Sequence, residues 1–454
     1  MRRYALPVYD GLSKETMTNR NRREFLHSSA RAGAAAIATR AFPILGANDR
    51  VNVAVVGLGG RGRDHIGMYA ELPQARLAGV CDVNQAQVER GAALVEKLTG
   101  GKPKSWLDLR QAFADKEIDA VSIATPNHWH SLATIWACQA GKDVYCEKPA
   151  CHNVWEGRRM IEAARKYKRM VQIGSQSRTT IHKIRAMQLL REGAIGKVYL
   201  AKALCFKRRK SIGHTPDEAV PAGLNWDFFL GPAPMRPYTL NRYAYNWHWF
   251  WDTGNGDIGN QGVHEMDIAR WGLNQPGLPR SVVSSGGKFA YTDDQEAPNT
   301  LLTSFDYGDA QLVFEVRGLL TGGEGGIAYD GANYIGNLFY GSEGWMAVDL
   351  EGFQIYKGEK REKVMDEKHA EPKTWDTRPH IANFLKAVRE RKGLSADVET
   401  GVASASLCHL ANIAYRTGRK LRFDSAADHF TGDAEANRLL TRPYRAPYVV
   451  PEKV

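Results

Sequence analysis

Short apolar runs alternate with amphipathic segments over the first third of this 454-residue chain. The apolar runs are rich in Val, Ile and Ala, which is typical of buried strands, and the segments between them have helical spacing. Such an alternation predicts a parallel sheet covered by helices on both faces. The predicted strands are Val51–Val56, Arg76–Cys81, Ala120–Ala124, Asp143–Cys146 and Met170–Ile173, and two of the predicted helices are Ser131–Ala140 and Val154–Tyr167.

The pattern changes beyond about residue 181. A helix-like segment leads into long stretches in which apolar and polar residues alternate, and these predict a large, mostly antiparallel sheet. Two amphipathic helices follow, and the last residues read as an irregular tail. The predicted strand regions are Lys197–Phe206, Arg280–Phe289, Asn299–Tyr307, Ala310–Arg317 and Gly336–Leu350, and the predicted helices are Ile181–Glu192, His380–Arg391 and Thr400–Thr417.

The first predicted strand runs directly into glycines with the spacing G-x-G-x-x-G. Gly57 would form a tight turn, Gly59 would let a pyrophosphate approach the backbone, and Gly62 would let the next helix pack closely on the strand. Asp82 ends the second predicted strand, 20 residues after Gly62, where a carboxylate would meet ribose hydroxyls. We therefore predict a dinucleotide site that includes Gly60 and Arg61; the alternative is a purely structural glycine turn.

Three polar motifs follow predicted strands, at the edge of the sheet where open α/β sheets bind ligands. They are Thr125-Pro126-Asn127-His128, Glu147-Lys148-Pro149 and Gly174-Ser175-Gln176. Together with the glycine run and the stretch Gly254–Asp267, the first two resemble the motifs of the Gfo/Idh/MocA family of oxidoreductases. The resemblance covers roughly residues 52–417.

This resemblance implies a Rossmann domain followed by an α/β domain with a large, mostly antiparallel open sheet that often supports oligomers. It also implies a nicotinamide cofactor and a sugar, cyclitol or similar polyol as substrate. We predict NAD over NADP because no arginine follows Asp82. The remaining cofactor-binding candidates are Thr125, Asn127, His128, His130, Glu147 and Lys148. The expected divisions are a leader over 1–47, the Rossmann domain over 48–175, the substrate domain over 176–420 and a tail over 421–454.

Lys148 matches the family lysine that lies near the nicotinamide and the reacting hydroxyl. His264 is the natural general base or acid for that hydroxyl because an imidazole titrates near neutral pH. The family often has aspartate where this chain has Asn260, and an amide cannot act as a base. Asp257 or Asp267 could replace it, and Asp267 shares a helix face with His264.

Aromatic residues are dense just before the glycine-rich stretch. On an extended segment Trp247, Trp249 and Trp251 would present one face, on which sugar rings stack; the alternative is an apolar domain interface. We select Trp249, Trp251, Arg178, Asn260 and His264 as substrate-binding candidates. The basic run Lys207–Lys210 could bind an acidic sugar or a phosphate, and its alternative is a solvated loop.

The net charge of +11 is concentrated near the N-terminus. Residues 1–47 contain eight basic and three acidic side chains, including the pair Arg22-Arg23, followed by an Ala/Gly-rich run. This composition predicts a twin-arginine signal and export to the periplasm, with no stable membrane span; the alternative is a basic tail. The remaining charge does not indicate a nucleic-acid partner. The six cysteines have neither zinc spacing nor the spacing of a disulfide framework, so we predict no metal site.

These observations predict an exported NAD(P)-dependent oxidoreductase that acts on a sugar, cyclitol or glycoside hydroxyl. Free nicotinamide is expected to be scarce outside the cytoplasm, so we expect a tightly bound cofactor. The family resemblance implies a homo-oligomer. One alternative is an NAD-dependent glycoside hydrolase that oxidises its substrate transiently. The other is a non-catalytic sugar-binding protein on the same fold, which Asn260 keeps open.

Overall fold

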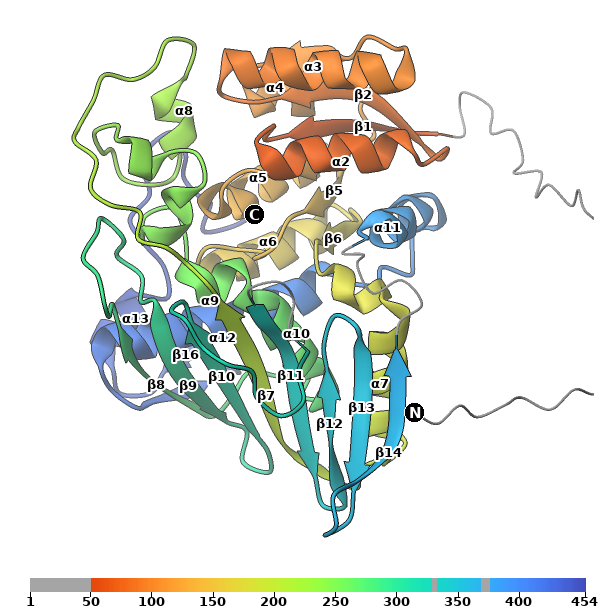
Figure 1. The fold of residues 1–454 in the computed structure, drawn as a ribbon. Helices are drawn as coiled ribbons and strands as arrows, with labels where there is room; N and C mark the ends of the chain where they lie inside the picture. The colour runs from red at the N-terminus through yellow and green to blue at the C-terminus, as the bar shows by residue number, and fades with distance from the viewer. Residues whose placement is uncertain (1–49, 329–332, 369–375) are drawn as a thin grey trace, which may run out of the picture. The chain divides into compact units, whose positions relative to one another are not determined.

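Two sheets of different kinds organise the described part of the chain (Figure 1). The computed structural model describes residues 50–328, 333–368 and 376–454, all within the unit Asp49–Val454. The predicted leader over residues 1–47 lies outside the described residues. No helix among the described residues is long and apolar enough to cross a membrane.

The first sheet has six strands in the order β3-β2-β1-β4-β5-β6, and every neighbouring pair is parallel. Parallel neighbours need a crossover connection, which explains the alternation of strands and helices. Five strands agree with the predicted ones to within one residue at each end. β3 was not predicted because its three residues form no apolar run. The strands are β1 (Val51–Val56), β2 (Ala75–Cys81), β3 (Lys104–Trp106), β4 (Ala120–Ile123), β5 (Asp143–Cys146) and β6 (Val171–Ile173).

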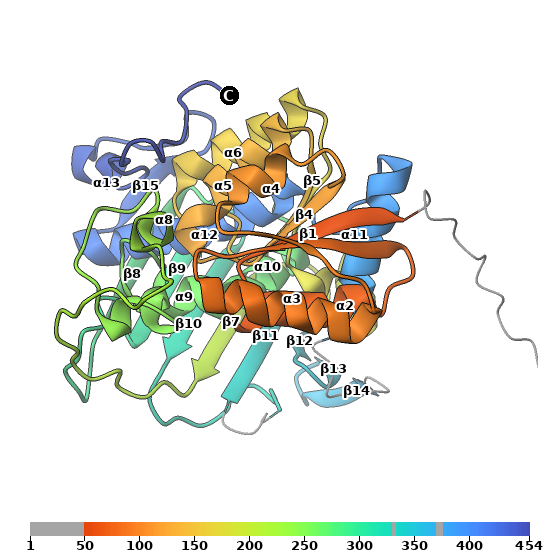
Figure 2. The ribbon, with the colours of Figure 1, turned by 90° about the horizontal axis from the view of Figure 1, so that it is seen from above.

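Helices cover both faces of this sheet, with α2 and α3 on one side and α4, α5 and α6 on the other (Figure 2). The helix predicted to begin at Ser131 begins at Asn127 instead, because Pro126 takes the cap position with a φ of −60°. The helices are α2 (Gly60–Ala70), α3 (Gln85–Thr99), α4 (Leu109–Ala114), α5 (Asn127–Gln139) and α6 (Val154–Lys166).

The second sheet has ten strands in the order β14-β13-β12-β11-β7-β10-β9-β8-β15-β16. Only β7 and β10 pair in parallel among its neighbouring strands, so the prediction of a mostly antiparallel sheet is confirmed. Its strands are β7 (Val198–Lys207), β8 (Ser281–Gly287), β9 (Thr300–Asp306), β10 (Gln311–Arg317), β11 (Asn333–Gly341), β12 (Gly344–Val348), β13 (Gly352–Lys357), β14 (Glu362–Lys368), β15 (Leu421–Asp424) and β16 (His429–Phe430).

The predicted β-rich stretch Gly336–Leu350 comprises two strands, β11 and β12, that form a hairpin. The strands β13, β14, β15 and β16 were not predicted. β14 is a polar, largely exposed edge strand, so it has no clear alternation of apolar and polar residues. β15 belongs to the predicted irregular tail, but it pairs with β8.

Helices cover one face of the large sheet, where α10 packs on β7 and α12 packs on β8. The three long helices predicted after residue 181 are present within two residues of their expected ends. The elements are η2 (Gln176–Thr179), α7 (Ile181–Arg191), α8 (Trp226–Leu230), η3 (Leu240–Arg242), η4 (Asn246–Trp249), α9 (Gly256–Asn260), α10 (Gly262–Gly272), α11 (Arg378–Glu390), α12 (Val398–Thr417) and α13 (Ala434–Arg438).

The C-terminal part of the chain returns to the first sheet. Ile381 and Phe384 of α11 belong to the apolar cluster of Val53 and Ile66. Tyr448, in the predicted irregular tail, is only 2% exposed and belongs to the cluster on the other face of that sheet. Residues from the C-terminal part of the chain therefore pack on both faces of the parallel sheet.

Candidate active site

The glycine-rich segment forms a tight turn between β1 and α2. Gly57 has a φ of +86°, which favours glycine, and a Cβ on Gly62 would lie 1.8 Å from the carbonyl oxygen of Gly57. A Cβ on Gly59 or Gly60 would meet nothing within 4 Å, so the backbone is open on that side. Gly59 caps α2 without a side-chain hydrogen bond. The first N–H groups of α2 are therefore available to a phosphate, at the positive end of the helix dipole.

Asp82, at the end of β2, is fixed beside this turn. Its Oδ2 accepts a hydrogen bond from the Leu58 N–H at 2.6 Å, and its Oδ1 accepts one from the Asn84 N–H at 2.9 Å. Burial raises the pKa of Asp82. The carboxyl is thus held in place next to the open backbone, where the ribose of a dinucleotide would lie.

Glu147 is the centre of a buried ionic cluster. Its Oε1 accepts a hydrogen bond from Arg61 Nε at 2.7 Å and lies 3.0 Å from His65 Nε2. Burial opposes ionisation, but Arg61 and His65 hold the pKa of Glu147 well below its usual range. Oε2 also accepts a hydrogen bond from the Lys148 N–H at 3.2 Å. Glu147 therefore fixes the backbone that carries Lys148.

Lys148 and His264 lie on one wall of the site. Lys148 Nζ donates a hydrogen bond to the carbonyl oxygen of Asn260 at 2.8 Å. Burial lowers the pKa of Lys148, against the opposing charge of Glu147. Burial and the charge of Lys148 hold the pKa of His264 well below its usual range, so the imidazole is neutral at pH 7. A neutral base and an ammonium group with a lowered pKa therefore share this wall.

A cavity of about 740 Å³ joins the glycine turn to this pair. It brings together candidates from five separate motifs of the sequence. The predicted site residues that line it are Gly57, Gly59, Gly60, Arg61, Asp82, Thr125, Asn127, His130, Glu147, Lys148, Asn260 and His264. The candidates Gly62, His128, Arg178, Trp249, Trp251 and Asp257 are not among the lining residues.

The aromatic wall differs from the predicted one. Residues 246–249 form the 3₁₀-helix η4 rather than an extended segment, so the spacing of two does not place the tryptophans on one face. Trp247 and His248 line the cavity and stack on each other with ring centroids 3.6 Å apart. Trp249 is buried beneath the Arg209 guanidinium, and Trp251 lies beneath Arg416. We therefore correct the assignment of Trp249 and Trp251 as substrate-binding residues to supporting positions.

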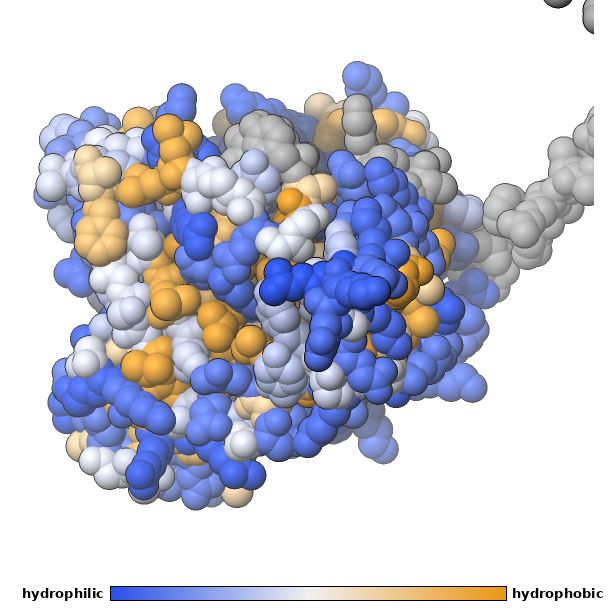
Figure 3. All heavy atoms as spheres, turned by 60° about the horizontal axis from the view of Figure 1, so that its bottom comes forward, coloured by the Kyte–Doolittle hydropathy of each residue, from blue (hydrophilic) through white to orange (hydrophobic). Residues whose placement is uncertain are grey.

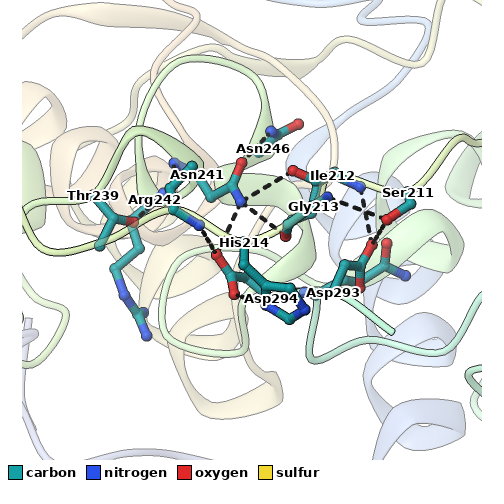
Figure 4. Close-up of polar contacts among 12 residues, drawn as sticks. Ser211, Ile212, Gly213, His214, Thr239, Asn241, Arg242, Asn246, Asp293 and Asp294 are labelled. Carbon is teal, nitrogen blue, oxygen red and sulfur yellow. Dashed lines mark hydrogen bonds and ion pairs between the residues drawn. The ribbon is translucent and has the colours of Figure 1, made fainter. Parts of the chain in front are cut away.

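A polar network holds the segment that carries this wall (Figure 4). Asn241 Nδ2 donates hydrogen bonds to the Ile212 carbonyl oxygen at 3.1 Å and to Asp294 Oδ2 at 2.9 Å, and Asn241 Oδ1 accepts one from Asn246. Asp294 also lies 2.7 Å from His214 Nδ1. These contacts join three loops, so the position of Tyr243 to His248 depends on residues far away in sequence.

Arg178 and Asp257 are occupied by ion pairs. Both guanidinium bonds of Arg178 go to Asp267, each at 2.8 Å. Asp257 binds Arg209 in the same two-bond manner, at 2.7 and 3.0 Å. The ion pair with Arg209 occupies Asp257, so Asp257 does not act as a base. Asp267 is bound by Arg178 and also accepts a hydrogen bond from Ser404, so it does not orient His264. We correct these three interpretations to structural roles.

His128 and Gly62 lie behind the cavity. The His128 ring contacts the carbonyl oxygens of Phe229 at 2.8 Å and Thr253 at 3.3 Å, and burial lowers its pKa to about 3. His128 thus joins α5 to the second domain rather than facing a cofactor. Gly62 permits close packing of helix and turn, as its spacing predicts, without lining the cavity.

Several lining residues were not among the candidates. Gln176 and Lys207 lie in motifs that the sequence had marked, the third polar turn and the basic run. Phe228 and Tyr448 also line the cavity, and no local sequence pattern marks either residue. The buried Oε1 of Gln176 has no hydrogen-bond partner among the described residues. The same holds for the Oγ1 of Thr125, one of the predicted candidates. Buried polar atoms normally have partners, so these two atoms fit a cavity that is filled by a polar ligand.

Two models of one protein family match the chain. The first, described as "Oxidoreductase family, NAD-binding Rossmann fold", matches residues 51–175. The second, described as "Oxidoreductase family, C-terminal alpha/beta domain", matches residues 179–285 and 346–450. Together they cover the first sheet and parts of the second, but not residues 286–345, which include β9, β10 and β11.

Curated relatives match shorter segments. A "Glycosyl hydrolase family 109 protein 1" of Akkermansia muciniphila is 29% identical over 162 residues, which are 34% of this chain and 33% of the relative. The levoglucosan dehydrogenase of Pseudarthrobacter phenanthrenivorans is 27% identical over 238 residues, 52% of this chain and 54% of the relative. The chain thus matches between a third and about half of the length of these relatives.

Solved structures share the fold over most of the chain. The WlbA dehydrogenase of Bordetella pertussis, solved with NADH and UDP-GlcNAcA, has a TM-score of 0.61 at 20% sequence identity, over 83% of this chain and 99% of that chain. The glycine turn, the placement of Asp82 and the two family models agree with each other. The chain belongs to the Gfo/Idh/MocA family of NAD-binding oxidoreductases.

Proposed function

We propose that this protein is an NAD-dependent oxidoreductase that acts on a hydroxyl group of a carbohydrate. The observation that carries the proposal is the single cavity in which the open glycine turn and Asp82 are continuous with Lys148 and His264. Family membership and the names of the relatives, among them an inositol 2-dehydrogenase and a levoglucosan dehydrogenase, support the same reaction class.

Lys148 and His264 have different roles at the substrate hydroxyl. Neutral His264 accepts the hydroxyl proton, and the Lys148 ammonium donates a hydrogen bond to the oxygen as it becomes a carbonyl. Asn260 fixes Lys148 through its backbone oxygen, and its amide donates to the Tyr245 hydroxyl at 3.0 Å. The glycine turn and Asp82 would hold NAD, which would supply the acceptor for a hydride from the same carbon.

The cofactor stays bound between turnovers in this proposal. Phe228 and Tyr448 line the nucleotide end of the cavity, and Asp227 joins the segments that carry them. Asp227 Oδ2 accepts a hydrogen bond from the Tyr448 hydroxyl at 2.7 Å, and Asp227 pairs with Arg445. The tail thus closes over the nucleotide end, which supports slow release of NAD. Protein purified without added nucleotide should carry NAD, identified by its mass, whereas Tyr448→Ala should lose it on gel filtration.

Replacement of Lys148 tests the reaction. Lys148→Ala should lower kcat by about 10²- to 10⁴-fold, the usual contribution of a positioned acid–base group, while bound NAD is retained. Lys102→Ala, at an exposed lysine outside the cavity, is the matched control. Full turnover by Lys148→Ala would contradict the proposal and favour a non-catalytic sugar-binding protein.

A second candidate is an NAD-dependent glycoside hydrolase. The similarity to the glycosyl hydrolase family 109 protein, over a third of each chain, favours it. The products separate the two reactions: an oxidoreductase removes two hydrogens from the sugar, whereas the hydrolase releases the aglycone without accumulating NADH or a keto-sugar. A panel of glycosides and free sugars analysed by mass decides between them.

We also propose a homo-oligomer that forms through the open face of the large sheet. Exposed apolar side chains such as Val283 and Leu302 lie on its strands, 41% and 48% exposed. Figure 3 shows apolar patches among polar residues on the side of the molecule turned forward there. Leu302→Lys should reduce the mass measured by light scattering, whereas an unchanged mass would place the interface elsewhere.

Export by the twin-arginine route is a further proposal. Its basis is the sequence pair Arg22-Arg23 and the Ala/Gly-rich run after it, which lie outside the described residues. Fusion of residues 1–50 to a folded reporter should send the reporter to the periplasm, and changing both arginines to lysine should abolish this.

A further inference from the structure

The substrate end of the cavity is positively charged. Lys148 and Lys207 both line it, together with Gln261, Tyr245 and neutral aromatic side chains. Glu147, the lining carboxylate next to Lys148, is already bound by Arg61. A neutral sugar needs only hydrogen bonds, so a second lysine beside the first requires another explanation.

Lys207 is held in place by the fold. It ends the central strand β7, and it shares the helix-covered face with Ala203 and Cys205 because side chains alternate along a strand. Lys207 Nζ donates a hydrogen bond to Gln261 Oε1 at 3.1 Å, and Gln261 Nε2 donates onward to Glu265 at 3.3 Å. One of the three N–H groups of Lys207 is thus used to orient the side chain at the cavity.

The other cations of the basic run are neutralised or turned away. Arg209 is bound by Asp257, and Arg208 donates to backbone carbonyl oxygens. Lys207 forms no ion pair with a carboxylate among residues 50–328, 333–368 and 376–454. Glu265 lies behind Gln261, and burial raises the pKa of its carboxyl to about 7, so it does not fully cancel the charge of Lys207.

We propose that the carbohydrate carries an anionic group, a carboxylate or a phosphate, and that Lys207 recognises this group while Lys148 and His264 hold the reacting hydroxyl. The inference rests on the proposed function and narrows its substrate to acidic sugars. Lys207 is a specificity residue here rather than part of the proton transfer. An anionic substituent would also satisfy the N–H groups of Lys207 that Gln261 does not use.

Matched sugars test the charge preference. Hexoses, the corresponding hexuronates and the corresponding hexose phosphates should be compared by kcat/KM with the NAD-containing protein. We expect at least tenfold higher kcat/KM for one of the two anionic series, and the preferred series identifies the group as carboxylate or phosphate. Lys207→Gln should lower that value about 10- to 100-fold and so reduce the ratio of kcat/KM between the anionic and the neutral sugar.

Two control variants and one binding measurement make the result decisive. Lys207→Arg should keep the anion preference, and Lys210→Gln, at an exposed residue outside the cavity, should behave as wild type. Sugar binding is measured separately by quenching of tryptophan fluorescence, since Trp247 lines the cavity. A wild type that prefers neutral sugars, or a Lys207→Gln variant that loses both series equally, overturns the inference and leaves the oxidoreductase intact. If no sugar is oxidised, the proposed function fails, and tighter anion binding that is lost in Lys207→Gln still supports this inference.

Discussion

The two ends of the cavity are built in different ways. The phosphate-binding turn of the nucleotide end is encoded by one short segment, in which the important atoms are backbone N–H groups between Gly57 and Gly62. The substrate end is assembled from side chains that meet only in the folded chain: Lys148 and Asn260, joined by a hydrogen bond, are 112 residues apart. Local geometry therefore determines the first end, and tertiary packing determines the second.

The charges differ in the same way. At the nucleotide end, Arg61 is paired with buried Glu147, and Arg110 is paired with Asp108 near the surface. Lys148 and Lys207, at the substrate end, instead donate to a carbonyl and an amide oxygen. Charges that are satisfied internally form a rigid receptor for a resident ligand, whereas lysines bound only to neutral oxygens keep their charge available for a ligand that exchanges.

The largest combined effect, on stability and on cofactor binding, is expected at the glycine turn. Gly62→Ala would place a Cβ 1.8 Å from the Gly57 carbonyl oxygen, so the backbone of the turn must move. We expect a loss of about 3 kcal/mol in stability, at the upper end for overpacking, and no detectable NAD binding. Gly67→Ala in the same helix is the control: its Cβ meets nothing within 4 Å, so it should stabilise the protein by about 0.5–1 kcal/mol. Denaturant unfolding measures the stability, and the nucleotide content of the purified protein measures NAD binding. Equal stability and equal NAD content of the two variants would contradict the role of the glycine turn.

The ionic cluster gives the next largest effect. Glu147→Gln removes the buried carboxylate partner of half-buried Arg61 and should cost about 3 kcal/mol at pH 7, at the lower end for a broken buried pair. The folded pKa of Glu147 lies below its unfolded value of about 4.5, so its contribution is complete above pH 4.5 and is lost as the pH falls through the folded pKa. Denaturant unfolding of wild type and variant should therefore differ by a constant amount from pH 8 to 5. A difference that disappears near pH 6 would contradict the assigned charge state.

The strands of the first sheet were predictable because each is a short apolar run with a polar turn at its end. The same reasoning located Asp82, Lys148 and the glycines, whose roles depend on neighbours within a few residues or on the common edge of a parallel sheet. The family resemblance added His264. Gly57, Gly59, Asp82 and Lys148 line one cavity in the structure, and their binding of a cofactor stays a prediction.

The substrate end was less predictable for a physical reason. The spacing of Trp247, Trp249 and Trp251 indicates a shared face only if the segment is extended, but η4 turns Trp249 inward beneath Arg209. Arg178 forms an ion pair with Asp267, which lies 89 residues later in the chain on α10. Tyr448 is a similar case at the nucleotide end, because it reaches the cavity from the tail and no local pattern marks such a return. Long-range pairing of side chains decides these positions.

The network of Figure 4 tests whether distant contacts set the substrate end. Asn241→Ala removes donors to Ile212 and Asp294 and leaves the buried oxygens without them, which should cost about 1–3 kcal/mol. The sugar KM should rise while the NAD content stays unchanged, because the network holds only the aromatic wall. Asn383→Ala, which also removes an amide donor but lies on α11 outside the cavity, is the control and should leave KM unaltered. Loss of NAD from Asn241→Ala would show that the two ends are not independent.

The smallest effect is expected from replacing Trp247, and it should exceed the effect of replacing Trp251. Trp247→Leu removes a ring that lines the cavity, and the sugar KM should rise about tenfold, since an aromatic contact contributes about 0.5–1.5 kcal/mol beyond its buried area. Trp251→Leu should change KM by less than twofold, because Trp251 stacks beneath Arg416 away from the cavity. Steady-state kinetics with the preferred sugar measures both. Equal effects would restore the extended arrangement that the sequence predicts, and a larger effect of Trp251 would mean that the substrate binds on the other side of η4.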